Sequence, residues 1–140
     1  MSLKTYNPKE VSVIVGARVI TGFAEDSKVI VARENDSWAK VAGVDGEVTR
    51  SKSNDKSGSI TINLMQSSDD NAFLTALYQS DELSGAGVVP VTVKDNSGTS
   101  LYIAPEAWIR KPPDSEFSRE AGPREWILDC AELTMNVGGN

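Results

Sequence analysis

The chain contains no histidine and only one cysteine, and these two scarcities remove several classes of site. Without histidine there can be no Ser-His-Asp or Cys-His catalytic arrangement, and no zinc site of the kind that uses histidine. A single cysteine, Cys130, cannot form an internal disulfide, and its place in an alternating apolar run predicts a buried, reduced thiol. Paired carboxylates need no histidine, but no spacing of acidic residues here indicates a hydrolase of that type. We therefore expect no enzyme activity, no cofactor and no metal site.

Long apolar runs and clusters of basic residues are also missing. No apolar run approaches the length that crosses a membrane, and the first ten residues contain no apolar signal core. This predicts a protein that is made in the cytoplasm and binds no membrane. The net charge is −6, which argues against general binding to nucleic acid because phosphates require clustered Lys and Arg. Residues 71–140 hold 5 basic and 10 acidic residues, so we expect the acidic surface in that half.

The chain does contain a series of short β-like runs. Its 140 residues fit one domain, residues 1–140. Two hairpins are predicted, one turning at Gly16-Ala17 and one turning at residues 95–98. Pro90 cannot donate a ladder hydrogen bond, so its strand should be an edge strand or begin near that residue. The expected strands are residues 11–15, 18–21, 28–33 and 37–42 with a turn at 34–36, 59–65, 87–94, 99–104, 106–110, 116–119 and 124–133.

One segment, residues 69–83, has the pattern of a helix. Ser67 is the expected N-cap, and Asp69 and Asp70 suit the positive N-terminal end, which we favour over a metal or acid/base role for this pair. Gly85 and Gly87 are expected to end the helix. Its apolar stripe comprises Ala72, Phe73, Ala76, Leu77 and Leu83. The expected fold is therefore α+β and mainly β, a sandwich or partly closed barrel with one packed helix.

A long polar segment, residues 43–58, separates two β-like runs and is expected to be an extended loop. A compact domain rarely carries so long a connection without a use for it, and this one has too few apolar residues to form a core of its own. Val44 and Val48 are its large apolar residues. Its charges balance, which suits contacts with another chain. The candidate inter-subunit or ring-stacking residues are Asp45, Glu47, Arg50, Lys52, Asp55 and Lys56.

The same stretch carries a family resemblance. The run VAGVDGEVTRSKSNDKSGSITINLMQ resembles the tail tube proteins of contractile-tailed bacteriophages. KEVSVIVGARVITGFAEDSKVIVAR is similar to the opening strands of that family. DELSGAGVVPVTVKD and PEAWIRKPPDSEFSREAGPREWILDC are similar to its second half. The resemblance covers residues 6–133 and rests on overall pattern, with no catalytic signature.

The resemblance implies a structural virion protein that forms stacked six-fold rings, a hollow tube inside a contractile sheath. Four strands per subunit would give about 24 strands and, at ~4.8 Å per strand, an inner wall roughly 37 Å across. The implied partners are further copies of the chain and the tail sheath, baseplate and tail terminator proteins. Phage DNA would pass through the lumen without specific binding, since an acidic or neutral wall does not hold it. The implied location is the phage tail, assembled in the host bacterial cytoplasm.

Within this interpretation, residues 43–58 are expected to order against the next subunit, and the plainer interpretation is a mobile surface loop. Deleting residues 47–55 should leave a folded monomer that cannot polymerise. Trp38, Trp108 and Trp126 are expected in the core or in subunit contacts, because base stacking would need basic surroundings.

Two other functions stay open. One is the ring protein of a type VI secretion or other contractile injection system, which neighbouring capsid and terminase genes would argue against. The other is a monomeric β-barrel binding module.

Overall fold

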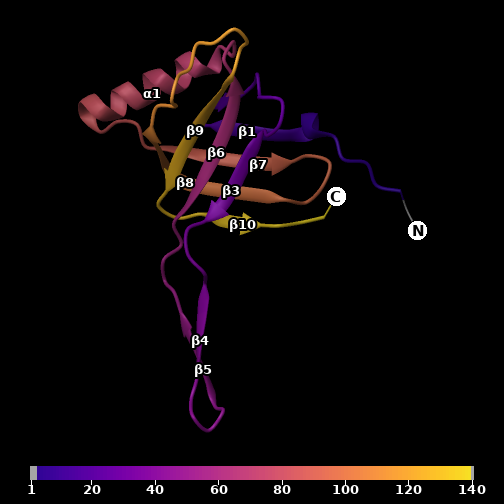
Figure 1. Ribbon diagram of the computed structural model, residues 1–140, viewed down its shortest axis with the longest axis vertical. Coiled ribbons are helices and arrows are strands. Elements are labelled where there is room, and N and C mark those ends of the chain that lie inside the picture. The colour runs from indigo at the N-terminus through magenta and orange to yellow at the C-terminus, as the bar shows by residue number, and fades with distance from the viewer. Residues whose placement is uncertain (1–2, 140) are drawn as a thin grey trace.

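The computed structural model describes residues 3–139, which form a mainly antiparallel β body, one helix and a projecting hairpin (Figure 1). No helix in the described part of the chain is long and apolar enough to cross a membrane. The elements are the 3₁₀ helix η1 (Pro8–Glu10), β1 (Val11–Val15), β2 (Arg18–Val19), β3 (Val29–Arg33), β4 (Trp38–Ala42), β5 (Val48–Lys52), β6 (Gly58–Met65), α1 (Asp70–Ser84), β7 (Val89–Asp95), β8 (Leu101–Lys111), β9 (Pro123–Cys130) and β10 (Thr134–Asn136).

The body is one bent sheet with the strand order β2-β1-β7-β8-β9-β6-β3, and β10 also pairs with β8. The 11-residue strand β8 joins two parts of this sheet, because its first half pairs with β10 and its second half with β9. β7, β8 and β10 run across Figure 1, and β9, β6 and β3 cross them. Strands β2 and β3 end the sheet order, so it is open. A mainly β fold with one helix is thus confirmed, whereas the sheet is not closed into a barrel.

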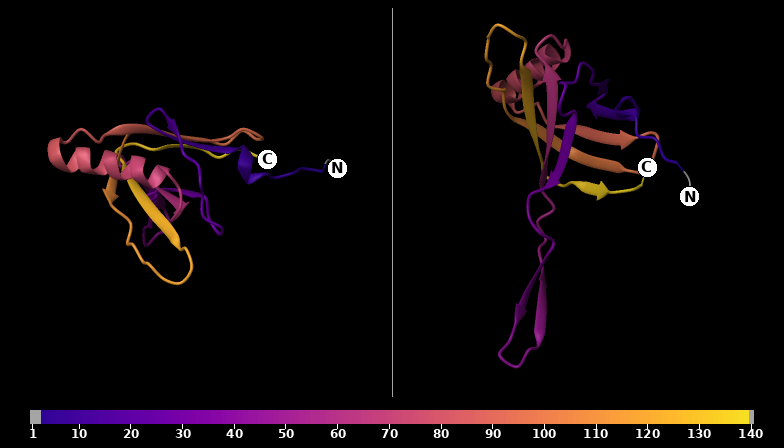
Figure 2. Two further views of the ribbon diagram at one scale, coloured as in Figure 1. Left: turned by 90° about the horizontal axis from the view of Figure 1, so that it is seen from above. Right: turned by 45° about the vertical axis from the view of Figure 1, so that its right-hand side comes forward.

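The core lies between the two parts of the sheet and helix α1, which runs alongside them (Figure 2). Alternating apolar side chains of β6 and β9 supply much of it, because every second side chain of a strand points to the same face. Trp126 of β9 is buried, and its indole Nε1 donates to Asn71 Oδ1 at 2.9 Å. Asn71 Nδ2 in turn donates to the Met65 carbonyl oxygen at 2.9 Å. This pair of bonds fixes the start of the helix against the ends of β6 and β9.

Helix α1 confirms the expected helix and corrects its details. The helix begins at Asp70, and neither Ser67 nor the N-cap residue Asp69 makes the expected side-chain cap. Asp70 is buried and turned away from the helix end toward Arg18 and Thr21. Gly85, with φ 71°, ends the helix as expected. Leu74, absent from the expected stripe, is the buried core contact, whereas Ala72, Ala76 and Leu83 are exposed.

The two predicted hairpins, β1–β2 and β7–β8, are both present. Pro90 lies at the start of β7, as expected from its missing N–H, and its carbonyl oxygen accepts from the Gly16 N–H at 2.8 Å. The edge-strand alternative was wrong, because β7 lies between β1 and β8. The strand expected at residues 116–119 is irregular, and the two strands expected at 99–104 and 106–110 are one bulged strand, β8.

Candidate functional site: the arm and the acidic groove

Strands β4 and β5 form a hairpin that projects from the body, and we call residues 37–53 the arm (Figures 1 and 2). The segment 43–58, expected as an extended loop, contains strand β5, which pairs with β4. Residues 37–42 were also expected to pair with residues 28–33 across the turn at 34–36. This was wrong, because β3 pairs with β6. The turn closes with the Gly43 N–H donating to the Glu47 carbonyl oxygen at 2.7 Å, and Gly46 takes φ 87°. Asp45-Gly46 is a strong hairpin signal that could have revealed this element from the sequence.

The register of the arm sorts its charges onto one face. Pairing of Lys40 with Arg50 and of Trp38 with Lys52 places these four side chains on the same side of the hairpin. The Arg50 guanidinium lies 3.8 Å from the centre of the Trp38 ring. We call this side the basic face; it consists of Trp38, Lys40, Ala42, Val48, Arg50 and Lys52. The opposite side carries no charge and consists of Ala39, Val41, Thr49 and Ser51.

The six candidate residues of the polar segment do not form one cluster. Asp45 and Glu47 lie in the turn at the tip, and Arg50 and Lys52 lie on the basic face. Asp55 and Lys56 lie at the base, after β5 and before β6.

Asp55 is tied to the base of the arm by its own hydrogen bonds. Its carboxylate accepts from the Ser57 N–H at 2.9 Å and from Asn35 Nδ2 at 2.5 Å. Hydrogen bonds from Ser57 lower the pKa of the Asp55 carboxyl, followed in effect by the bond from Asn35. Asp55 therefore stabilises the conformation of the chain at the base of the arm.

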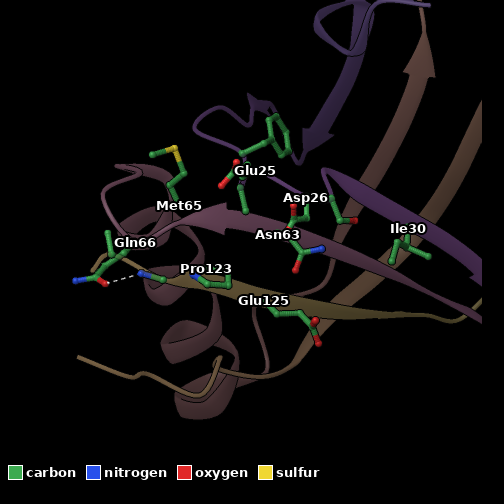
Figure 3. A pocket seen from close by; sticks show the side chains of 13 residues that line it. Glu25, Asp26, Ile30, Asn63, Met65, Gln66, Pro123 and Glu125 are labelled. Atoms are coloured by element: carbon green, nitrogen blue, oxygen red, sulfur yellow. Dashed lines mark hydrogen bonds between the residues drawn. The ribbon is translucent and has the colours of Figure 1, made fainter. Parts of the chain in front are cut away.

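An acidic groove lies at the other end of the same strands (Figure 3). The segment that precedes β3 overhangs the last residues of β6 and the first residues of β9, and the cavity between them measures about 480 Å³. Of its described lining residues, Glu25, Asp26 and Glu125 are acidic and none is basic. The Gly122 N–H donates to Gln66 Oε1 at 3.3 Å across its rim. No pattern in the sequence indicates this groove, because Glu125 joins Glu25 and Asp26 from a distant part of the chain.

Within residues 3–139, no group of three or more His, Cys, Asp or Glu side chains is placed to hold a metal ion. The arm and the groove instead present charge and apolar surface to the outside. An open sheet edge and a projecting charged hairpin are features of proteins that assemble with other chains.

Comparison with known proteins identifies the family. Residues 11–138 match the model of the bacteriophage PhiTE tail tube protein family, and the chain belongs to this family of phage tail tube proteins. It is also 34% identical over 144 residues to structural protein ORF10 of Pseudomonas phage KPP10, covering 97% of this chain and 83% of that protein. The protein is therefore a structural component of the phage virion tail and not an enzyme.

Two solved structures share the fold at low sequence identity. One is the sheath/tube terminator of the extracellular contractile injection system PVC in its extended state, with a TM-score of 0.65, 15% identity, and coverage of 98% of this chain and 100% of that chain. The other comes from the PVC sheath-tube complex in its extended state, with a TM-score of 0.62, 14% identity, and coverage of 94% and 91%. The bent open sheet with one helix thus occurs both in a terminator structure and in a sheath-tube complex.

Proposed function

We propose that six copies of this chain close into a ring and that the rings stack into the hollow tail tube, through which DNA passes into the host. The observation that carries this proposal is the open four-stranded part of the sheet, β8-β9-β6-β3. In the described chain, the edge of β3 that faces away from β6 has no strand partner. An open edge invites pairing with another chain, and a ring of copies removes every such edge. Because the chain belongs to a family of tail tube proteins, we infer that this pairing between copies builds the tube.

The charge of the chain suits a conduit. A net charge of −6 per copy would be multiplied by the copies in each ring. Like charges repel, so the phosphate backbone of DNA would slide past such a wall without being held by released counterions. Tail sheath, baseplate and tail terminator proteins would be the partners outside and at the ends of the tube.

Negative-stain electron microscopy of the purified protein over a concentration series tests the proposal. We expect rings and hollow tubes with six-fold end views, because both the sheet edge and the arm are exposed in the single chain. Single rings that never stack would instead indicate a terminator-like role, consistent with the fold shared with the PVC terminator. Small particles of constant mass at every concentration would contradict ring assembly and favour the monomeric binding module.

A further inference from the structure

A buried arginine lies beneath the loop that joins β8 to β9. Arg124 is the second residue of β9 and is only 6% exposed. It occupies a core-facing position, since the buried residues Trp126, Leu128 and Cys130 follow it at every second place along the strand. An apolar side chain would suit such a position better, because removing a cation from water is costly unless an anion accompanies it.

No anion accompanies this cation within residues 3–139, because none of the ion pairs there includes Arg124. Its Nη1 donates to the Pro123 carbonyl oxygen and its Nη2 to the Glu116 carbonyl oxygen, both at 3.1 Å. These bonds use two of the five N–H groups of the guanidinium. No fully buried side-chain nitrogen of the described chain lacks a partner, so the unpaired Nε–H of Arg124 is open to a ligand.

Arg124 lines a cavity of about 220 Å³ between the loop, helix α1 and β9. The loop, residues 112–122, passes beside the first turns of the helix (Figure 1), which contribute Asn71 and Thr75 to the lining. The centre of the Phe117 ring in the loop lies 5.3 Å from the guanidinium carbon, and Phe117 is 81% exposed. The cavity therefore opens to the outside beside Phe117, with the buried cation in its wall.

Gln66 contributes a second donor to the same cavity. Because its Oε1 accepts from the Gly122 N–H, its amide nitrogen points away from the acidic groove (Figure 3). That nitrogen makes no hydrogen bond within the described chain. Asn71 and Trp126 also line the cavity, but they bond to each other and form a fixed wall.

The lining favours a carboxylate over other anions. Of the described residues that line the cavity, Arg124 alone is a lysine or arginine, and none is acidic. One carboxylate balances one guanidinium and can accept two parallel N–H bonds from its planar fork. A phosphate dianion would leave excess negative charge in the cavity. Phe117, Pro112 and Pro113 offer apolar surface to the remainder of a carboxylate ligand.

We propose that this cavity binds a carboxylate, held by the Arg124 guanidinium and the Gln66 amide nitrogen. The two carbonyl bonds of Arg124 position the guanidinium, and the carboxylate neutralises its charge. The proposal goes beyond the tube and does not depend on it, because all these groups belong to one chain.

Phenylacetate and phenylacetamide are matched probes, since only the first is an anion. We record nitrogen-15 NMR spectra of the full chain below the concentration at which it assembles. We expect phenylacetate to shift the Arg124 Nε–H and Trp126 indole N–H signals saturably, with a dissociation constant of about 1 mM. Phenylacetamide and inorganic phosphate should bind about tenfold more weakly or worse. Equal binding of phenylacetamide, or no saturable shift with phenylacetate, would overturn the proposal, and tighter binding of phosphate would overturn the choice of a carboxylate.

Two variants with the same change of charge test the assignment to Arg124. Arg124→Gln should weaken phenylacetate binding by about tenfold or more, read from the Trp126 signal. Arg119→Gln is the control and should leave binding unchanged, because Arg119 is exposed in the same loop and forms no ion pair in the described chain. Unchanged binding by the first variant, or an equal loss in the second, would overturn the assignment.

Arg124→Lys separates the loss of charge from a fault in folding. It keeps the cation without the planar fork, so its binding should fall between those of wild type and Arg124→Gln. Circular dichroism checks that each variant is folded. Binding by the lysine variant as weak as that of a folded glutamine variant would contradict a role for the charge.

The natural carboxylate is either a free molecule or an acidic side chain of another copy, and assembly distinguishes the two sources. If phenylacetate raises the protein concentration needed for tubes, the source is a neighbouring copy. If that concentration is unchanged at saturating phenylacetate, the source is a free carboxylate. Absence of tubes from the wild type would count against the proposed function alone, since binding is measured on the single chain.

Discussion

The burial of Asp70 shows how one residue ties the helix to the sheet. Its carboxylate accepts from the Arg18 side chain, from the Thr21 N–H at 2.6 Å and from the Thr21 hydroxyl at 3.2 Å. Burial raises the pKa of Asp70, but these hydrogen bonds and the charge of Arg18 together outweigh burial and hold the pKa below its usual value. The sequence suggested a helix-capping role because it could not show that Arg18 would lie beside this position.

We expect Asp70→Asn to lower the free energy of unfolding by about 2 kcal/mol at pH 7, because it weakens charge-assisted bonds to a buried group. Folding lowers the pKa of this carboxyl, so its stabilisation is present above the unfolded value of about 3.9 and is lost as the pH falls through the folded value. The difference between variant and wild type should therefore shrink below about pH 4. Urea unfolding at several pH values measures it.

Asp69→Asn is the matched control for this prediction, since Asp69 is exposed and makes no side-chain cap bond. It should change stability little at any pH. An equal loss for the Asp70 variant at pH 3 and pH 7 would show that the charge of Asp70 plays no part.

Cys130 illustrates a residue whose environment the sequence did predict. It is buried as expected, and burial raises the pKa of its thiol to about 11. The alternating run around it was sufficient, because a strand with one buried face places every second side chain in the core.

At the scale of elements, the arm is an addition to the body and not a part of its core. Every residue of β4 and β5 is exposed, and these strands pair with each other alone in the described chain. An isolated two-stranded hairpin is marginally stable in water, so docking against another chain would stabilise it. The deletion of residues 47–55 suggested by the sequence would remove β5 and leave β4 unpaired.

A cleaner deletion follows from the base of the arm, where the Ser53 N–H donates to the Ser37 carbonyl oxygen at 2.8 Å. Replacing residues 38–52 with Asn-Gly joins two positions that are already adjacent, by a turn that favours hairpins. We expect a melting temperature close to that of the wild type, because no core residue is removed, and no stacked tubes. Circular dichroism and electron microscopy measure the two properties. Tubes of normal length would show that the arm is dispensable.

At the scale of the whole molecule, the arm and the groove lie at opposite ends of the strand pair β3–β6, so the two ends of the chain present different surfaces. In the proposed tube, a chain without its arm keeps the open edge of β3 for ring closure but offers no arm to the next ring. Such a chain would interrupt the proposed stack at its own position.

We therefore expect the arm-replaced chain, mixed with wild type before assembly, to shorten the tubes as its fraction rises. Tube lengths in electron micrographs measure the effect, and wild-type chain added to the same total concentration serves as the control. Lengths that stay constant at every fraction would contradict a stack held by the arm.

The sequence by itself determined the composition of the fold and the kind of protein. Short alternating runs and one helical stripe are local properties, and they were enough to predict a mainly β fold, whereas the resemblance of residues 6–133 to tail tube proteins predicted the kind of protein. Tertiary structure alone decided that β3 pairs with β6 and that Glu125 joins Glu25 and Asp26. Strand pairing depends on which distant segments bury their apolar faces together, and a local pattern carries no record of that choice.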